Sequence, residues 1–153
     1  MSTPERRLAD LGLSVPEVAA PVAAYVPAVR TGTHVYTSGQ LPLRDGRLIT
    51  TGKVGGAVSA EEAAQCARQC ALNALAAVRA EIGDLGQVTR VVKVVAFVAS
   101  TPEFTGQPQV ANGASELLGQ AFGDAGQHAR SAVGVPVLPL DAPVEVELVV
   151  EVA

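Results

Sequence analysis

The sequence predicts a single α+β domain in which a mixed β-sheet carries two main helices on one face. Three observations lead to this fold class. The 153 residues suffice for one domain with a sizeable core. The expected elements follow in the order hairpin, helix, strand, helix, strand, strand, and two long helices can cover only one face of such a sheet. Residues 88–99 form a β-branched strand that is apolar on both sides, so both of its faces should be covered.

A short helix and several extended segments are expected in the first third of the chain. Thr3 is a helix cap and Pro4 suits the first helical position. This helix belongs to an N-terminal extension, residues 1–20, which precedes a main domain at 21–153. The pair Asp45-Gly46 tolerates positive φ and predicts a hairpin turn. Extended segments are expected at 25–29, 34–38 and 48–51.

A long helix is the clearest element. Ser59 and Glu62 have the spacing of a capping box, and Gly83 can end the helix after Ile82. Small residues recur on one helix face, which we expect to be buried: Ala63, Cys66, Ala67, Cys70, Ala74 and Ala77. The two cysteines on this face are interpreted as small buried side chains rather than as a disulfide or a metal pair.

Strands dominate the second half. Alternation within residues 88–99 predicts one face with Val91, Val95 and Phe97 around Lys93, and a second face with Val92, Val94, Ala96 and Val98. Thr101 and Pro102 cap a helical start that Pro108 interrupts, and a second helix then runs to Phe122. Two further strands are expected near 129–137 and 143–152.

Composition excludes several classes of function. Charged residues make up 17% of the chain and aromatic residues 3%. The net charge is −4 and the basic residues form no run, which argues against nucleic-acid binding. No run approaches the roughly 18 apolar residues of a membrane helix, and residues 1–10 lack the apolar core of a signal peptide, so a cytoplasmic location is expected. The low charged share indicates a surface partly buried in a homo-oligomer.

One arginine and one glutamate near the end of the chain are the best candidates for chemistry. Arg130 lies at the start of an apolar strand, where its guanidinium can bind a small carboxylate or phosphate. Glu145 lies on the next strand and can position a water or move a proton. If the two strands pair, these side chains can share a face. A structural Arg–Glu pair is the alternative interpretation of the same pattern.

Other polar residues are weaker candidates. Ser38 is a turn or ligand-contact residue, since it lacks the glycine pattern of a nucleophile elbow. Tyr25 and Asn112 can reach a pocket or be satisfied core polar groups. His128 is more often an edge residue than a base, and its distance from His34 in the sequence makes no ligand spacing, so neither metal nor cofactor is predicted. Lys53 stands in a glycine-rich loop that lacks the phosphate-loop pattern.

Several segments together resemble one known family. They are Thr37-Ser38-Gly39-Gln40-Leu41-Pro42, the strand Val91 to Val98, Ala129-Arg130-Ser131-Ala132-Val133, Leu138-Pro139 and Val144-Glu145-Val146-Glu147. They occur in the order of the Rid family, the reactive intermediate deaminases also known as YjgF-like proteins and once described as L-PSP endoribonucleases. Three positions differ from archetypal members: Ala132 replaces a cysteine, Gly134 a common glutamate, and His128 stands near a frequent proline. These differences and the greater length are typical of a divergent subgroup.

The resemblance implies a chorismate-mutase-like fold, a homotrimer, and metal-free hydrolysis of enamines and imines such as 2-aminoacrylate to 2-keto acids and ammonia. It implies that Arg130 binds the substrate carboxylate, that Glu145 positions or activates water, and that Tyr25, Ser38 and Asn112 line the pocket. The alternative is a non-catalytic trimer that binds a small carboxylate or a partner protein in the same clefts. A ribonuclease is a weaker alternative, because the chain is poor in basic and aromatic residues.

Overall fold

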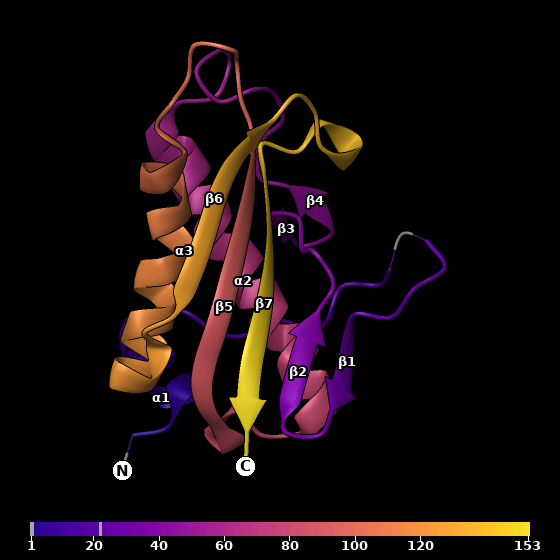
Figure 1. Ribbon diagram of the computed structural model, residues 1–153, viewed down its shortest axis with the longest axis vertical. Coiled ribbons are helices and arrows are strands. Elements are labelled where there is room, and N and C mark those ends of the chain that lie inside the picture. The colour runs from indigo at the N-terminus through magenta and orange to yellow at the C-terminus, as the bar shows by residue number, and fades with distance from the viewer. Residues whose placement is uncertain (1, 22) are drawn as a thin grey trace.

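A five-stranded sheet and two long helices form two layers (Figure 1). The computed structural model describes residues 2–21 and 23–153. The strand order is β1-β2-β7-β5-β6, and the strands are β1 (Ala28–Thr31), β2 (His34–Thr37), β5 (Val88–Ala99), β6 (Ala129–Val135) and β7 (Val144–Val152). The mixed α+β architecture predicted from the sequence is confirmed.

The strand that comes last in the sequence lies in the middle of the sheet. β7 pairs antiparallel with both β2 and β5, whereas β6 pairs parallel with β5 at the sheet edge. The two strands that carry Arg130 and Glu145 therefore do not pair, because β5 lies between them. The predicted strands extended slightly beyond β6 and β7, to 137 and from 143.

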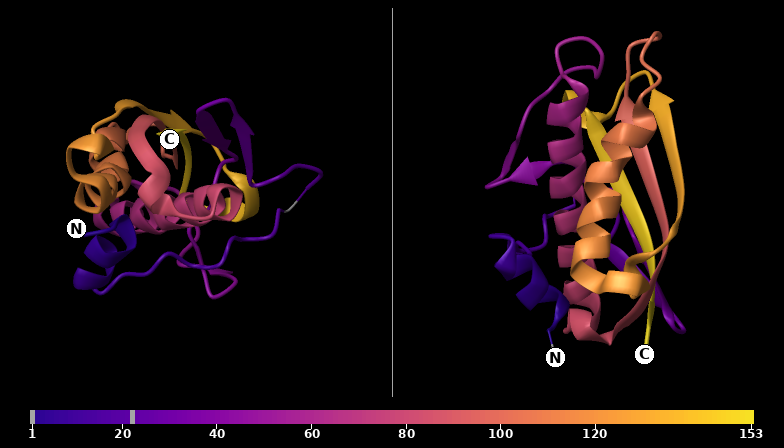
Figure 2. Two further views of the ribbon diagram at one scale, coloured as in Figure 1. Left: turned by 90° about the horizontal axis from the view of Figure 1, so that it is seen from below. Right: turned by 90° about the vertical axis from the view of Figure 1, so that its left-hand side faces the viewer.

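Both long helices pack against the same face of the sheet (Figure 2). Helix α2 (Ala60–Ile82) begins with the predicted capping box, in which Ser59 Oγ accepts from the Glu62 amide at 3.1 Å, and it ends at Gly83. Its predicted small-residue face is confirmed, since all six of those side chains are buried: Ala63, Cys66, Ala67, Cys70, Ala74 and Ala77. Small side chains allow α3 (Gln107–Phe122) to approach α2 closely.

The start of α3 corrects one prediction. Residues 101 and 102 are not helical, and Pro108 lies in the first turn of α3 rather than interrupting a helix. A proline in the first turn removes an amide that has no helical partner anyway. Pro108 therefore marks the start of α3 and does not interrupt a helix.

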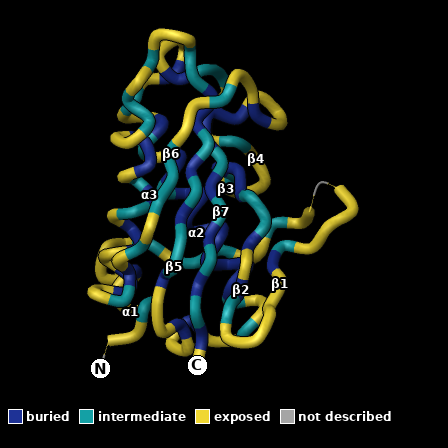
Figure 3. The backbone as a smooth tube through the Cα atoms, in the orientation of Figure 1, coloured by how far each residue is buried: buried dark blue, intermediate teal, exposed yellow. Residues whose placement is uncertain are grey.

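The two faces of β5 also differ from the prediction at one residue. Val91 is fully buried on the helix side with Val94, Ala96 and Val98. The register with β7 is irregular between Val91 and Lys93, and this irregularity breaks the simple alternation. Among the described residues no helix covers the opposite face, and half-buried residues alternate with buried ones along β7 (Figure 3). Apolar side chains on or beside it include Tyr36, Val95, Phe97 and Val133.

Short elements complete the fold. Helix α1 (Pro4–Asp10) is capped by Thr3 as predicted and buries Leu8, whereas Leu11 directly after it is 45% exposed. The predicted hairpin joins β3 (Leu43–Arg44) to β4 (Arg47–Leu48), with positive φ at both Asp45 and Gly46. The short 3₁₀ helices are η1 (Leu85–Gln87), η2 (Gly123–Gly126) and η3 (Pro139–Asp141). Among the described residues, no helix combines the length and apolar character that a membrane span requires.

Candidate functional site

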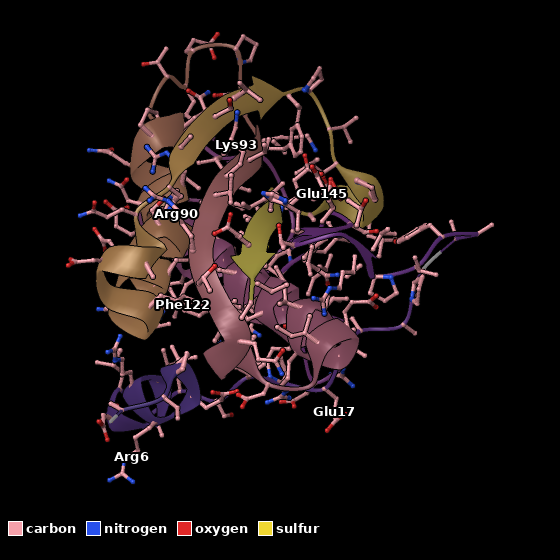
Figure 4. All side chains as sticks on the ribbon, turned by 60° about the horizontal axis from the view of Figure 1, so that its bottom comes forward. Arg6, Glu17, Arg90, Lys93, Phe122 and Glu145 are labelled. Atoms are coloured by element: carbon pink, nitrogen blue, oxygen red, sulfur yellow. The ribbon has the colours of Figure 1, made fainter. Side chains whose placement is uncertain are left out.

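Glu145 lies beside a cavity of about 480 Å³ at the start of β7 (Figure 4). It is half-buried and faces away from the helices, opposite Phe97 of β5. Tyr25 and Ser38 line the same cavity. The rest of the wall is mostly Ala, Pro and Leu from residues 19–27, 39–43 and 139. The structure therefore brings together three of the five residues proposed for a site.

The environment of Glu145 suits a group that exchanges protons. Burial raises the pKa of its carboxyl group above the ordinary value, and the nearby negative charge of Glu147 raises it further. A carboxyl group whose pKa is shifted toward neutrality is a better general acid or base near physiological pH. Glu145 is therefore the ionisable residue of the cavity that is best suited to transfer a proton.

The loop before Gln40 is shaped around this carboxylate. Gln40 forms a backbone bridge with Val146, in which the Gln40 amide donates at 2.8 Å and the Val146 amide at 3.0 Å. This bridge holds Gly39 against Glu145, where a Cβ on residue 39 would lie 2.8 Å from both Glu145 Cδ and Oε1. Only glycine leaves the carboxylate in its observed position.

We therefore expect Gly39→Ala to displace Glu145 and to reduce any reaction that depends on it by roughly 10-fold or more, as expected when a reacting group is misplaced by about 1 Å. The change is at the cavity and not in the core, so the melting temperature should fall little. Activity and thermal unfolding measured on the same preparation check this. A Gly39→Ala protein with wild-type turnover would contradict the close contact.

Ser38 has a structural role at the cavity edge. Its hydroxyl donates to the Val26 carbonyl oxygen at 2.6 Å, and its amide donates to the Pro27 carbonyl oxygen at 2.8 Å. These bonds tie the segment next to Tyr25 to the end of β2. Tyr25 is 44% exposed at the cavity. The hydroxyl oxygen of Ser38 retains acceptor capacity toward a ligand.

Arg130 lies in a separate position between β6 and α3. Its Nη1 donates to Asn112 Oδ1 at 2.8 Å and to Ser115 Oγ at 3.2 Å, and its Nη2 donates to the Pro108 carbonyl oxygen at 3.5 Å. All three acceptors are neutral. Within residues 2–21 and 23–153, no carboxylate forms an ion pair with Arg130, so its charge is uncompensated.

The expectation that Arg130 and Glu145 share a face is wrong for one chain. Arg130 is in register with Val94, which is fully buried on the helix side, whereas Glu145 is in register with Phe97 on the other side. The strands that carry them are also two spacings apart, about 10 Å. The same geometry excludes a structural pair of Arg130 and Glu145 within one chain.

Two residues that contact β6, Ser115 and Gln107, were not predicted from the sequence. Ser115 lies one turn after Asn112 on α3, so the spacing of three could have indicated a shared face. Gln107 explains the unusual Gly134: a Cβ on residue 134 would lie 2.8 Å from Gln107 Nε2. Lys53 forms an ion pair with Asp141, which gives the glycine-rich loop a structural contact.

The cysteines are unsuited to chemistry. Burial raises the pKa of the Cys66 thiol to about 11, and burial likewise raises the pKa of the Cys70 thiol well above its ordinary value. Both thiols are therefore protonated near neutral pH. Among the described residues, no group of three or more His, Cys, Asp or Glu side chains could hold a metal ion.

The fold and the cavity define a small α+β domain with a ligand-sized cavity where its central strand begins. The model of the family described as YjgF/chorismate mutase-like, putative endoribonuclease matches residues 5–152. The chain therefore belongs to this family, which confirms the resemblance seen in the sequence. Protein TCP17 of Trypanosoma cruzi is 46% identical over 145 residues, which cover 94% of this chain and 91% of that protein.

Solved structures agree with the family and show where this chain lies in it. A protein of unknown function from Agrobacterium tumefaciens is 44% identical with a TM-score of 0.93, covering 98% of this chain and 92% of that one. A putative endoribonuclease from Shewanella oneidensis is 34% identical with a TM-score of 0.96, covering 99% and 100%. The YjgF gene product of E. coli is 28% identical with a TM-score of 0.64, covering 88% and 93%. This chain is thus more similar to the first two than to E. coli YjgF.

Proposed function

We propose that this protein hydrolyses reactive enamines and imines, such as 2-aminoacrylate and related imino acids, to 2-keto acids and ammonia. The observation that carries the proposal is the half-buried Glu145 at a mostly apolar cavity, with a pKa raised by burial. Hydrolysis of an imine requires a site that holds the substrate beside a group able to activate water. The cavity and its carboxyl group fit that requirement.

The reaction needs only proton transfer and addition of water. Glu145 takes a proton from a water molecule as the water oxygen bonds to the imine carbon, and it passes this proton to the imine nitrogen, which gives a carbinolamine. The carboxylate then takes the proton of the new hydroxyl group and gives it to the amine, so that the carbon–nitrogen bond breaks, a carbonyl forms and ammonia leaves. An imine carbon is already electrophilic, so correct orientation of water and substrate supplies much of the acceleration.

The anchor for the substrate carboxylate is Arg130 of a neighbouring copy in a homotrimer. In one chain Arg130 and Glu145 lie on opposite faces of the sheet. The Arg130 guanidinium is held by neutral acceptors at an edge strand, which supports a role toward an anion from outside its own chain. The apolar face that no helix covers supports association of copies.

Ammonia release from freshly generated 2-aminoacrylate and from larger imino acids tests this function. Glu145→Gln should lose most turnover and keep binding of the 2-keto acid product, because the carboxyl group acts on water. Glu147→Gln is the matched control, two residues away on the same face, and should retain wild-type turnover at a pH at which Glu145 is deprotonated in both proteins. If the wild type binds 2-keto acids but hydrolyses none of the imines, the non-catalytic carboxylate-binding function replaces the hydrolase. Cleavage of RNA by the wild type would favour the activity named for the Shewanella relative, although a net charge of −4 counts against it.

The pH dependence of turnover should report Glu145. A base must be deprotonated, so turnover should rise with pH through a pKa that lies above the ordinary value of a glutamate. Glu147→Gln removes one cause of the raised pKa and should move this rise to lower pH. The folded protein binds a proton that the unfolded chain has already lost in this window, so stability should fall slightly as pH rises through it. A kcat profile from pH 4 to 9 for both proteins measures the shift, and identical profiles would contradict the assignment.

A further inference from the structure

A chain of hydrogen bonds connects η2, α3 and β6 at the base of Arg130. His128 Nδ1 lies 2.6 Å from the Gly126 carbonyl oxygen, and His128 Nε2 lies 2.8 Å from Ser115 Oγ. Ser115 Oγ in turn lies 3.2 Å from Arg130 Nη1. The three side chains are partly buried. The chain therefore runs from a fixed backbone carbonyl to the guanidinium.

The direction of each bond follows from the chemistry of its two ends. A carbonyl oxygen can only accept, so His128 Nδ1 carries a hydrogen and donates to Gly126. In the neutral ring, Nε2 is then an acceptor and takes the hydroxyl hydrogen of Ser115. A guanidinium can only donate, so Ser115 Oγ accepts from Arg130. Every donor and acceptor in the chain is matched with the imidazole neutral.

This arrangement decides how Ser115 presents itself to Arg130. A serine hydroxyl rotates freely and can turn its hydrogen in any direction. A hydrogen turned toward Arg130 would face another donor and would not hold the guanidinium. Because His128 takes the hydroxyl hydrogen, the Ser115 oxygen offers a lone pair to Arg130. Ser115 and Asn112, one turn apart on α3, then form two fixed acceptors for one nitrogen of Arg130.

We propose that His128 is a positioning residue that orients Arg130 through Ser115, so that the remaining donors of the guanidinium are presented in a fixed plane to a carboxylate. The inference rests on the proposed function in one respect, that Arg130 binds the substrate carboxylate. A fixed planar guanidinium loses less freedom when it binds a carboxylate with two hydrogen bonds, and the bound complex is correspondingly tighter. His128 and Ser115 thus set the affinity of the anchor without touching the ligand.

A nucleophilic Ser–His pair is a different use of the same contact, and the geometry disfavours it. The oxygen that would attack also accepts a hydrogen bond from the cationic Arg130, which occupies one of its two lone pairs and lowers its nucleophilicity. His128 is oriented by a neutral carbonyl and not by a carboxylate. The positioning role, in contrast, accounts for the hydrogen bonds from His128 to Gly126, from Ser115 to His128 and from Arg130 to Ser115.

Two substitutions of His128 test separately the hydrogen bonds made by its two ring nitrogens. The amide of Asn can replace Nδ1 and keep the bond to Gly126, but it does not reach Ser115. The longer Gln can place its amide oxygen near the position of Nε2 and accept from Ser115. His128→Asn and Ser115→Ala should therefore release Arg130, and His128→Gln should recover most of the loss. Both His128 variants remove the imidazole equally, so a difference between them reports the link to Ser115.

The first measurement is the ¹⁵N NMR spectrum of the Arg130 guanidinium in the intact protein, assigned by its loss in Arg130→Ala. Wild type and His128→Gln should show restricted rotation with separate Nη signals, and Ser115→Ala and His128→Asn should show averaged signals. The second measurement is the Kd of 2-oxobutanoate, with its uncharged amide as the control ligand. Ser115→Ala and His128→Asn should weaken 2-oxobutanoate binding about tenfold, the value of one charge-assisted hydrogen bond, and leave binding of the amide unchanged.

The outcomes distinguish this inference from the proposed function. Restricted rotation of Arg130 in a folded His128→Asn protein overturns the positioning role, whatever the binding result. Equal effects of His128→Asn and His128→Gln overturn it as well. Averaged Nη signals of Arg130 in His128→Asn together with unchanged binding of 2-oxobutanoate would support positioning by His128. The same result would contradict the role of Arg130 as the carboxylate anchor. A spectrum in which Nδ1 of His128 carries no hydrogen overturns the assigned directions of the bonds.

Discussion

Mixed trimers of Arg130→Ala and Glu145→Gln are expected to hydrolyse imines although neither variant does so alone. Arg130 and Glu145 lie on opposite faces of the sheet in one chain, so a cleft that uses both must take them from two copies. Each variant alone lacks one group in every cleft. Loss of the arginine should weaken carboxylate binding roughly 100-fold or more, from about 1.5–3 kcal/mol for each charge-assisted hydrogen bond.

The experiment is refolding of the two variants together from denaturant at equal amounts. Random assembly gives about one quarter of the clefts both intact groups, and turnover should return to about that fraction of the wild type. Mixing the variants without unfolding is the control and should restore nothing if trimers exchange slowly. The absence of any recovery in verified mixed trimers would show that the two groups do not act in one cleft. Light scattering that shows only monomers would contradict the assembly itself.

Gly113→Ala is expected to destabilise the fold more than any other single methyl group added to α3. A Cβ on residue 113 would lie 1.9 Å from the carbonyl oxygen of Ala64 on α2, so the two helices must separate. Overpacking of this kind costs about 3 kcal/mol. Denaturant unfolding monitored by circular dichroism measures the change in the free energy of unfolding.

Gly119→Ala is the matched control on the same helix. A Cβ on residue 119 meets nothing within 4 Å, so the substitution adds helix propensity without a clash. It should stabilise the protein by about 0.5–1 kcal/mol. If the two variants had equal stability, the close contact between α2 and α3 would not be a determinant of the fold.

Local signals in the sequence predicted most of the fold. The capping box at Ser59 and the Asp45-Gly46 turn depend on a few neighbouring residues, and both are confirmed. The family resemblance is likewise confirmed by the match over residues 5–152. Pro108 was misread, since a proline before apolar periodicity can begin a helix as well as break one. The face of Val91 was misassigned because register irregularities depend on the partner strand.

The candidate site was harder to predict because it depends on which strands are neighbours. Alternation correctly grouped the side chains within β6 and β7, but it could not show that β5 separates these two strands. The single chain therefore contains two groupings, Glu145 with Tyr25 and Ser38, and Arg130 with Asn112. The spacing of Ser115 from Asn112 indicated a shared helix face, but it could not show that His128 and Arg130, which lie outside α3, are the partners of Ser115. The roles assigned to these residues stay predictions.

The central position of β7 has a consequence for how the chain folds during synthesis. His34 on β2 pairs with Glu151 on β7, far apart in the sequence, and β5 pairs with the same strand β7. Before β7 emerges from the ribosome, the β1–β2 hairpin and the β5–β6 pair each present an open, apolar strand edge with no complement. Contacts of such high sequence separation form slowly, and open edges recruit other chains. The nascent domain thus remains exposed to aggregation until β7 appears, and a chaperone that shields strand edges should improve its yield more than one that accelerates helix formation.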